Sequence, residues 1–383
     1  MARNIFYILL IIVLWGCATK GNDNAVASAD SWPIFRASSD LSGYTKEKIC
    51  EKPSLLWSYK SNQRSVSSPV VLRGTTYWCD TRGVVRGVDA EGNEAFTYDL
   101  QQPVEATPLL HDSTLYIGCI DGSLAAISLS KRDTMWCFRC EGQVSASPNS
   151  VKIGERTAII FGSYDNYMYC IDKEQGSLIN RFESGYYING AVAVKDNYAV
   201  FGGCDGWLRL IDCKQGVMCD SLQLEGYIPS SPAIANDNVY IGDYAGNIYE
   251  VQLSDGRFAD HRTVVSASEE NASLVSVPAV SPTTLYVISN DKYLSAINRT
   301  DGTTTWRYLL KGNVGESSPV VCRDKIIVCT KTGIVTVLSA DNGELLWEYD
   351  TGEQIVSSPA VVRNRFYILT AKGTLFCFGE NKK

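Results

Sequence analysis

The most reactive side chains in this sequence belong to its thirteen cysteines. A thiolate can bind soft metal ions, and pairs of thiols form disulfides in oxidising compartments. Cys137 and Cys140 lie three residues apart and are followed by Glu141, where a covalent haem site needs a histidine. Residues three apart in a β-strand point to opposite faces, so we do not expect these two thiols to meet.

Other cysteines fall at repeated positions along the chain. Cys170 and Cys377 occupy a position that holds glycine or alanine elsewhere, so we expect small, buried and unreactive side chains there. Cys79, Cys119 and Cys204 share a second position, at the end of a predicted strand. A metal ring built from these three would need ligands from units that are not all adjacent, so we do not predict one.

The remaining candidates for chemistry are sparse. If one disulfide forms, Cys213 and Cys219 are best placed for it, because they flank a tight turn. The two histidines, His111 and His261, have no partner motif around them. The chain also lacks a glycine-rich phosphate loop, zinc-ligand spacing and a nucleophile elbow. We therefore predict no catalytic residue, no metal site and no bound cofactor.

An internal repeat positions these residues. A Ser-Pro-like step followed by apolar and β-branched residues recurs eight times, at intervals of about forty residues. The steps end at Pro69, Pro108, Pro148, Ala191, Pro232, Pro278, Pro319 and Pro359. Each unit reads as four short strands separated by Gly, Asn or Asp turns. Four-stranded units repeated at this period stack around an axis as the blades of an all-β propeller.

The two ends of the repeat set the number of blades. The last unit offers only three strands, and residues 55–60 resemble a fourth strand placed ahead of the first unit. We predict that this N-terminal strand completes the last blade and leaves no open sheet edge. The count is then eight antiparallel blades, or seven if the degenerate unit at Asn189 and Ala191 is not a blade. The longest irregular insert is expected from Arg257 to Ser273.

The details of the repeat resemble a known family. A Ser-Ser-Pro step, an Asp-x-Gly or Lys-x-Gly turn, a third strand ending in Ile-Asp and a later Gly-x-x-x-Trp resemble the pyrroloquinoline-quinone-like propeller repeat. The resemblance covers residues 31–379, and the segment from Trp32 to Arg36 is similar to the one before the first blade in that family. It implies that fourth-strand tryptophans dock between blades. These are Trp57, Trp136, Trp306 and Trp347.

The resemblance also bears on catalysis. Quinone-dependent dehydrogenases of this fold carry two adjacent cysteines in a disulfide ring, calcium ligands and an aspartate base. This chain has no Cys-Cys pair, and its blades have near-minimal length, without the insertions that house such sites. A member of the family without enzymatic activity is therefore the favoured interpretation, with a quinone-dependent dehydrogenase as the less favoured one.

The N-terminus predicts export. Residues 1–16 carry one positive charge and then an apolar run too short to span a bilayer, as in a signal peptide. Leu14, Gly16 and Cys17 resemble the lipobox of bacterial lipoproteins, which implies lipidation of Cys17. Residues 17–30 are small and polar, as in a flexible tether, and the propeller is assigned to residues 31–383. We expect an outer-membrane lipid anchor, with the propeller in the periplasm.

One face of the predicted propeller is the candidate binding face. Propeller geometry places the turns between second and third strands beside the Ser-Pro steps, and Tyr164 and Asp165 belong to this wider set. Exposed aromatic residues beside carboxylates favour binding of a protein or a sugar. The candidate residues are Tyr186, Tyr187, Asp205, Trp207, Tyr227, Asp243 and Tyr244.

Two classes of function follow from these features. The resemblance, together with the predicted lipid anchor, implies a scaffold that docks envelope proteins, as in the machinery that assembles β-barrels in the outer membrane. The alternative is a periplasmic propeller that binds a small molecule or a glycan. The formal net charge of −7 and the lack of any basic cluster argue against nucleic acid as a partner.

Overall fold

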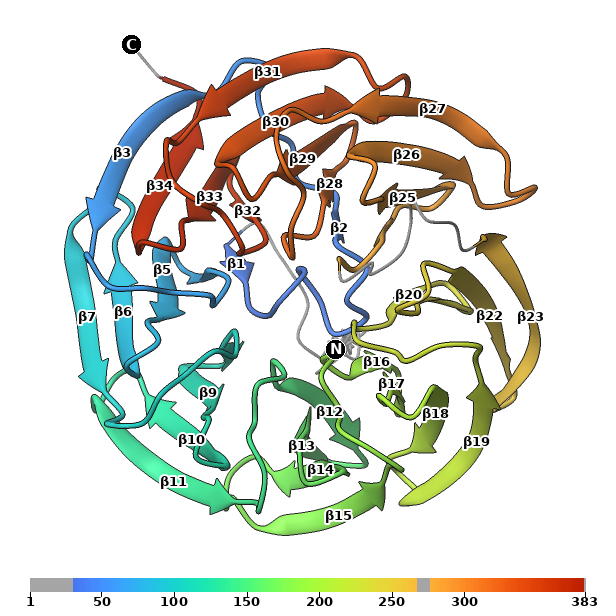
Figure 1. Ribbon diagram of the computed structural model, residues 1–383. Coiled ribbons are helices and arrows are strands. Elements are labelled where there is room, and N and C mark those ends of the chain that lie inside the picture. The colour runs from blue at the N-terminus through green and yellow to red at the C-terminus, as the bar shows by residue number, and fades with distance from the viewer. Residues whose placement is uncertain (1–29, 267–275, 382–383) are drawn as a thin grey trace, which may run out of the picture.

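The computed structural model describes residues 30–266 and 276–381, which form eight sheets around a central axis (Figure 1). Within these ranges the chain contains strands and turns but no helix, and so none long and apolar enough to cross a membrane. The prediction of an all-β, eight-bladed propeller is confirmed. The leader, Cys17 and most of the predicted tether lie outside the described residues.

The blades follow one another in chain order, each with its first strand nearest the axis (Figure 1). Blade 1 contains β4 (Val70–Leu72), β5 (Thr75–Cys79), β6 (Val84–Val88) and β7 (Glu94–Asp99). Blade 2 contains β8 (Leu109–His111), β9 (Thr114–Gly118), β10 (Ser123–Ser128) and β11 (Asp133–Arg139). Blade 3 contains β12 (Asn149–Ile153), β13 (Arg156–Gly162), β14 (Tyr167–Asp172) and β15 (Leu178–Glu183). Blade 4 contains β16 (Ala193–Lys195), β17 (Tyr198–Gly202), β18 (Trp207–Asp212) and β19 (Val217–Gln223).

The second half of the ring repeats this order. Blade 5 contains β20 (Ala233–Ala235), β21 (Asn238–Gly242), β22 (Ile248–Ser254) and β23 (Arg257–Val265). Blade 6 contains β24 (Ala279–Val280), β25 (Thr284–Ile288), β26 (Tyr293–Asn298) and β27 (Thr304–Leu309). Blade 7 contains β28 (Val320–Cys322), β29 (Lys325–Cys329), β30 (Ile334–Ser339) and β31 (Leu345–Asp350). Blade 8 contains β32 (Ala360–Val362), β33 (Arg365–Leu369), β34 (Thr374–Gly379) and the N-terminal β3 (Ser54–Lys60).

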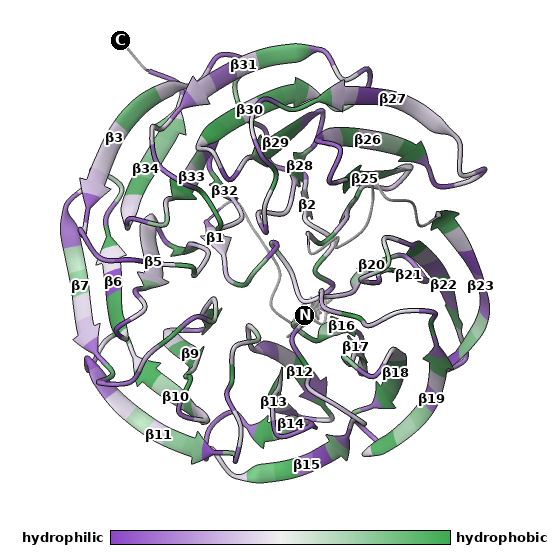
Figure 2. Cartoon of the chain, in the orientation of Figure 1, coloured by the Kyte–Doolittle hydropathy of each residue, from purple (hydrophilic) through white to green (hydrophobic). Residues whose placement is uncertain are grey.

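The hydropathy of the strands follows their place in the blade. Third strands such as β10 and β30 are largely hydrophobic, because neighbouring blades cover both of their faces (Figure 2). Outermost strands such as β7 alternate between exposed polar and buried apolar residues (Figure 2). The turns between strands use positive φ angles: Gly333 has φ of 101°, and a Cβ there would lie 2.5 Å from the carbonyl oxygen of Glu353.

The closure of the ring is as predicted from the sequence. β3 pairs antiparallel with β34, with Leu55 opposite Phe378 and Tyr59 opposite Leu375. The strand therefore supplies the missing outer strand of blade 8 and covers its edge.

Two predictions about the middle of the chain need correction. The degenerate fourth unit is a blade, but Ala191 takes the place of the serine before the proline, so Val192 takes the place of the proline. The N–H of Ala191 donates to Ser231 Oγ at 2.8 Å, just as the N–H of Ser68 donates to Thr107 Oγ1. The segment from Arg257 to Val265, expected to be irregular, is a nine-residue strand. The rest of that predicted insert lies almost entirely outside the described residues.

The residue before each proline builds a hydrogen-bonded ring around the axis. In six of the eight blades its backbone N–H donates to the hydroxyl at the same position of the next blade, at 2.8–3.2 Å. The last of these bonds, from Ser358 to Ser68, spans the closure. The ring is interrupted where Ala191 and Val277 stand in place of a serine or threonine, since neither has a hydroxyl. We call this feature the hydroxyl ring.

The segment of residues 31–45 crosses the axis and plugs one end of the channel. Its β1 (Ser31–Trp32) joins blade 1 and its β2 (Tyr44–Thr45) runs parallel to β28 in blade 7. Between them, plug carbonyls accept hydrogen bonds from the first strands of blades 2, 4, 5, 6 and 7. The side chain of Arg36 is buried at its centre and donates to four backbone carbonyls. Burial lowers the pKa of this guanidinium to about 9, and Asp40 partly opposes that shift.

Three of the four predicted docking tryptophans make the same contact. The indole N–H donates to a backbone carbonyl in the next blade: Trp57 to Ala90 at 2.9 Å, Trp136 to Lys173 at 3.0 Å and Trp306 to Ala340 at 3.2 Å. Trp347 instead packs its ring edge-on against Phe366 and Phe378 of blade 8, with centroids 6.0 and 5.3 Å apart. All four indoles are half-buried between blades.

Candidate functional site

The Ser-Pro steps and the turns between second and third strands meet on one face of the ring, which we call the mouth face. In blades 1 to 5, 7 and 8, a backbone hydrogen bond joins this turn to the loop that leads into the same blade's first strand. Examples are Tyr164 to Gln143 at 3.0 Å, Cys204 to Tyr187 at 2.9 Å and Tyr244 to Tyr227 at 2.8 Å. The predicted candidate residues lie on these two sets of loops, or immediately after them.

The tyrosines of blades 3 and 4 form one stack. The ring of Tyr187 lies parallel to that of Tyr164, with centroids 4.9 Å apart and an interplanar angle of 7°. Tyr186 packs against Tyr187, with centroids 4.4 Å apart. Tyr186 and Tyr187 remain 50% and 39% exposed, so the stack presents an apolar surface to solvent.

The aromatic residues further around the ring are separate from this stack. Tyr227 and Tyr244 of blade 5 are 65% and 50% exposed and are joined through their backbones. Trp207 begins β18 and is only half-buried. Within the described residues no ring contact links Trp207 to any of these tyrosines. The aromatic candidate residues therefore form two exposed tyrosine groups, with Trp207 outside both.

Asp205 does not present its carboxylate to solvent. It accepts hydrogen bonds from the backbone N–H of Gly185 at 2.7 Å and of Trp207 at 3.1 Å, and it forms an ion pair with Arg209 at 2.5 Å. Burial by itself would raise the pKa of this carboxyl, but the hydrogen bond from Arg209 and these backbone donors lower it below its usual value. Asp205 thus ties its own turn to Gly185, in the loop that carries Tyr186 and Tyr187.

Asp243 plays the same part in blade 5 and is completely buried. Its carboxylate accepts from the backbone of Gly246 and Asn247 at 2.9 Å, from Asn247 Nδ2 at 2.8 Å and from the Tyr249 hydroxyl at 2.9 Å. A carboxylate satisfied in this way orders its turn and is out of reach of a partner. The sequence could not distinguish such a carboxylate from an exposed one.

Exposed charges divide the mouth face into two halves. The loops of blades 2 to 5 carry Glu105, Glu141, Glu183 and Glu225. The loops of blades 6 to 8 carry Lys292, Lys311, Lys331 and Lys372, with Glu316 and Asp350 as exposed acids among them. On the acidic half, Arg139 pairs with Asp121 at 3.1 Å. The exposed tyrosines thus lie in an acidic surrounding, a feature that the sequence did not reveal because the carboxylates come from four separate units.

The axis of the ring contains a cavity of about 210 Å³ that opens on the mouth face. Hydroxyls of the ring line it, and Phe35 of the plug forms its floor. These residues do not fit a quinone with its calcium ion. The guanidinium of Arg36 is committed to backbone carbonyls, and no three metal-ligating side chains lie close together within the described ranges. We derive no reaction step through such a group.

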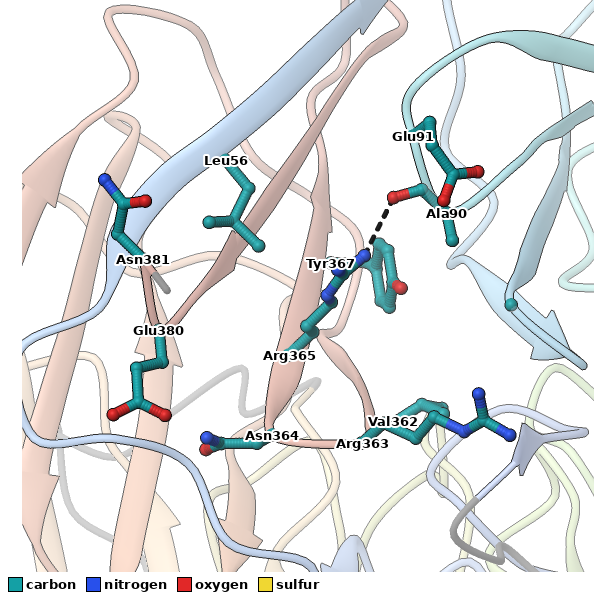
Figure 3. A pocket seen from close by; sticks show the side chains of 11 residues that line it. Leu56, Ala90, Glu91, Val362, Arg363, Asn364, Arg365, Tyr367, Glu380 and Asn381 are labelled. Atoms are coloured by element: carbon teal, nitrogen blue, oxygen red, sulfur yellow. Dashed lines mark hydrogen bonds between the residues drawn. The ribbon is translucent and has the colours of Figure 1, made fainter. Parts of the chain in front are cut away.

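A second cavity, of about 670 Å³, lies at the seam between blades 8 and 1 (Figure 3). Arg365 lies within it and donates to the carbonyl of Ala90 at 2.8 Å, across the closure (Figure 3). Tyr367 and Leu56 form an apolar wall, while Glu91 and Glu380 stand at its rim (Figure 3). This cavity is on the opposite side of the ring from the tyrosines, so it is not part of the candidate face.

The cysteines also differ from expectation in one respect. All twelve cysteines of the described residues are free thiols, including Cys213 and Cys219. The thiol that Cys213 contacts is that of Cys170, in the neighbouring blade. Cys170 and Cys377 are buried, as predicted. A short separation in sequence had suggested Cys219, but blade packing brings a residue 43 positions away into contact.

Comparisons with known proteins agree with this architecture. The structure aligns with a quinohemoprotein alcohol dehydrogenase from Comamonas testosteroni over 93% of this chain and 82% of that one, with a TM-score of 0.75 and 14% identity. It aligns with BamB from Moraxella catarrhalis over 86% of this chain and 98% of that one, with a TM-score of 0.70 and 18% identity. At such identities these likenesses show the fold alone, an eight-bladed propeller of pyrroloquinoline-quinone-like repeats.

Sequence comparison identifies the family within this class. The family model described as outer membrane protein assembly factor BamB matches residues 50–216, 121–294 and 290–381, and this chain belongs to that family. An outer membrane protein assembly factor BamB from Legionella pneumophila (strain Paris) is 26% identical over 140 residues, which cover 37% of this chain and 34% of the relative. The chain thus spans about a third of the length of the curated relatives it matches.

Proposed function

We propose that this chain is a non-catalytic scaffold of the bacterial envelope that docks a partner protein on the tyrosines of blades 3 to 5. The exposed tyrosines on the acidic half of the mouth face support this proposal most directly. Exposed aromatic groups of this kind supply large, rigid contact areas in protein interfaces. The names of its relatives make the machinery that assembles outer-membrane proteins the first partner to test.

The proposal includes a lipid anchor at Cys17 on the periplasmic side of the outer membrane. The described chain begins at Asp30, whose carbonyl accepts from Arg73 and whose carboxylate pairs with Arg363. Both arginines lie in turns between first and second strands, on the face opposite the mouth. Asp30 is thirteen positions after Cys17, a reach of at most about 45 Å. An anchor there would let the mouth face point away from the membrane.

The test compares two double variants of the lipidated protein. Tyr187→Ser with Tyr227→Ser removes one exposed ring from each tyrosine group, while Leu309→Ser with Leu345→Ser removes comparably exposed apolar side chains from blades 6 and 7. We expect the tyrosine variant to bind the purified periplasmic domains of the organism's barrel-inserting protein at least tenfold more weakly, and to lower the level of outer-membrane barrels. The leucine variant should behave as the unchanged protein. Equal binding by all three proteins would contradict the proposal.

The stacked pair Tyr164 and Tyr187 favours a second candidate, the binding of a glycan. Parallel aromatic rings offer a flat apolar platform on which a sugar ring can lie. In that case the tyrosine variant would lose affinity for envelope glycans while the level of outer-membrane barrels stays unchanged. The same pair of variants therefore separates the two functions.

A further inference from the structure

The interface between blades 3 and 4 lacks the tryptophan found one interface earlier. Between blades 2 and 3, Trp136 lies opposite Ala126 in the blade 2 sheet and donates to the carbonyl of Lys173 in blade 3. The corresponding residue in blade 3 is Asn180, which lies opposite Cys170. An amide is much smaller than an indole, so it does not fill the same space between blades.

Cysteines occupy the positions around this smaller side chain. Lys173 follows Asp172, whose carboxylate caps the turn after the third strand of blade 3. In blade 4, Cys213 follows Asp212, which caps the equivalent turn in the same way. Cys170 therefore stands where Ala126 stands, and Cys213 stands where the tryptophan's acceptor stands. A pair of thiols takes the place of the contact that the indole makes at the neighbouring interface.

The two thiols meet in the core. Cys170 is 1% exposed and Cys213 is 2% exposed, and both belong to one hydrophobic cluster shared by blades 3 and 4. The side chain of Cys170 raises the pKa of the Cys213 thiol more than burial does, so the two thiols are neighbours within that cluster. A disulfide between them needs Cβ atoms about 3.5–4.5 Å apart, a separation that side chains packed against each other across an interface can reach.

We propose that Cys170 and Cys213 form a disulfide that joins blade 3 to blade 4 in the exported protein. Two S–H bonds break and one S–S bond forms, while two electrons and two protons reduce the disulfide of an oxidising protein to two thiols. The proposal rests on the predicted export of the chain, since such an oxidant acts outside the cytoplasm.

The timing of the reaction follows from burial. The neighbouring Cys170 side chain and burial both raise the pKa of the Cys213 thiol, so the reactive thiolate is disfavoured once the blades have packed. Oxidation must therefore precede the final packing of blades 3 and 4, and a bond formed then is protected from later exchange.

The chain offers a matched control pair. Cys79 and Cys119 are also buried, come from adjacent blades and share one hydrophobic cluster. The Cys119 thiol, however, donates to the carbonyl of Ile117 at 3.9 Å. Cys79 and Cys119 should therefore stay reduced under conditions that link Cys170 to Cys213.

The experiment maps the linkages by mass spectrometry. The full chain is produced with its leader in an exporting bacterium, its free thiols are trapped with an alkylating agent during denaturation, and it is digested without reductant. We expect a linked Cys170 and Cys213 peptide pair, with Cys79 and Cys119 alkylated. Alkylated Cys170 and Cys213 in correctly exported, folded protein would overturn the proposal.

A second arm makes the outcome independent of export. The purified, denatured chain is refolded with oxidised glutathione, and the same peptides are examined. The linked pair should form here even if the leader fails to export the chain, and its absence from refolded protein would also overturn the proposal. In oxidised protein, the double variant Cys170→Ala with Cys213→Ala should have a lower melting temperature than the unchanged chain. Dithiothreitol should lower the melting temperature of the unchanged chain but not that of this variant. Cys79→Ala with Cys119→Ala should leave that sensitivity intact.

Discussion

The interfaces between blades fall into two groups that hold the ring together by different means. From blade 6 around through the closure to blade 3 the contact is aromatic, with Phe96 in place of a tryptophan between blades 1 and 2. Between blades 3, 4, 5 and 6 it is polar: Asn180, Asp220 and Arg262 stand at the fourth-strand position of the tryptophan. Arg262 even donates to the carbonyl of Arg299, at 2.6 Å, in the turn that corresponds to the indole's acceptor.

The polar interfaces coincide with the other irregular features of the ring. The hydroxyl ring is interrupted in blades 4 and 6, at Ala191 and Val277, and the exposed tyrosines project from blades 4 and 5. A chain built for stability alone would gain from an indole packed into every interface, as it has near the closure. The difference shows that the sequence of blades 3 to 5 departs from the repeat on both the packed and the exposed sides. It supports the assignment of the binding face to this arc.

The comparison is tested most strongly by truncation at two adjacent interfaces. Trp136→Ala removes a half-buried indole and its hydrogen bond to Lys173, and should lower the free energy of unfolding by about 2–4 kcal/mol. Asn180→Ala, at the next interface, should cost less than about 1 kcal/mol, because little apolar area is lost. Urea denaturation of both variants measures the difference. Equal losses would show that the two kinds of interface contribute alike.

A second test separates the structural role of Asp205 from a binding role. Asp205→Asn removes the charge that pairs with Arg209 in a mostly buried site and should cost about 1–3 kcal/mol at neutral pH. The carboxyl has a lowered pKa in the folded protein, so its contribution is present above the unfolded pKa of about 3.9 and is lost as the pH falls through the folded value.

The stability difference between the unchanged protein and this variant should depend on pH in a defined direction. As the pH falls below about 4, the unfolded chain takes up the proton before the folded protein does, so the advantage of the unchanged protein over Asp205→Asn should shrink. Thermal unfolding of both proteins between neutral and acidic pH measures this. A stability difference that does not vary with pH would contradict the assigned ion pair.

The hydroxyl ring can also be tested between blades 7 and 8. The buried backbone N–H of Ser318 donates to the Ser358 hydroxyl at 3.0 Å, and Ser358→Ala removes that acceptor. A buried donor left without a partner costs about 1–2 kcal/mol, and the loss should appear as a lower urea midpoint with an unchanged slope. Ser357→Ala, at the neighbouring buried serine, is a useful comparison, since its hydroxyl donates to Leu369 within the same blade. Equal shifts of the urea midpoint in both variants would argue against a special role of the ring in joining neighbouring blades.

The order of the strands could be predicted from the sequence, but several of their partners could not. Each strand is encoded by its own few residues. The additional strand at residues 55–60 could complete only the last blade, because that blade alone lacks a fourth strand. The plug carries no repeating pattern, and Arg36 adopts a positive φ of 63° that only its tertiary contacts explain. Likewise, the sequence places Asp205 and Asp243 in turns but does not show whether their carboxylates are buried or exposed, because their hydrogen-bond donors lie on other strands and loops. The contact of Cys170 with Cys213 depends on packing between blades, which spacing along the chain does not encode.

A substitution can supply the hydroxyl that the hydroxyl ring lacks at Ala191 in blade 4. Ala191→Ser would place a hydroxyl opposite the Ser147 backbone, as Ser231 lies opposite Ala191, and the side chain borders the axial cavity, which leaves room for it. We expect a gain of about 0.5–1 kcal/mol, the net value of one buried hydrogen bond. Differential scanning calorimetry would show it as a raised melting temperature. A loss would mean that the gap in the ring is needed for packing of the fourth blade.

The smallest effect on folding should come from the residue with the most exposed ring. Tyr227→Ser removes a side chain that is 65% exposed, so the free energy of unfolding should change by less than about 0.5 kcal/mol. The same change should weaken partner binding if the polar interfaces and the exposed tyrosines belong to one functional arc. Isothermal titration with the periplasmic domains of the barrel-inserting protein, beside urea denaturation, measures both quantities on one sample. A variant that loses stability but keeps its affinity would assign Tyr227 to the fold, and the arc of blades 3 to 5 would then be distinguished by its packing alone.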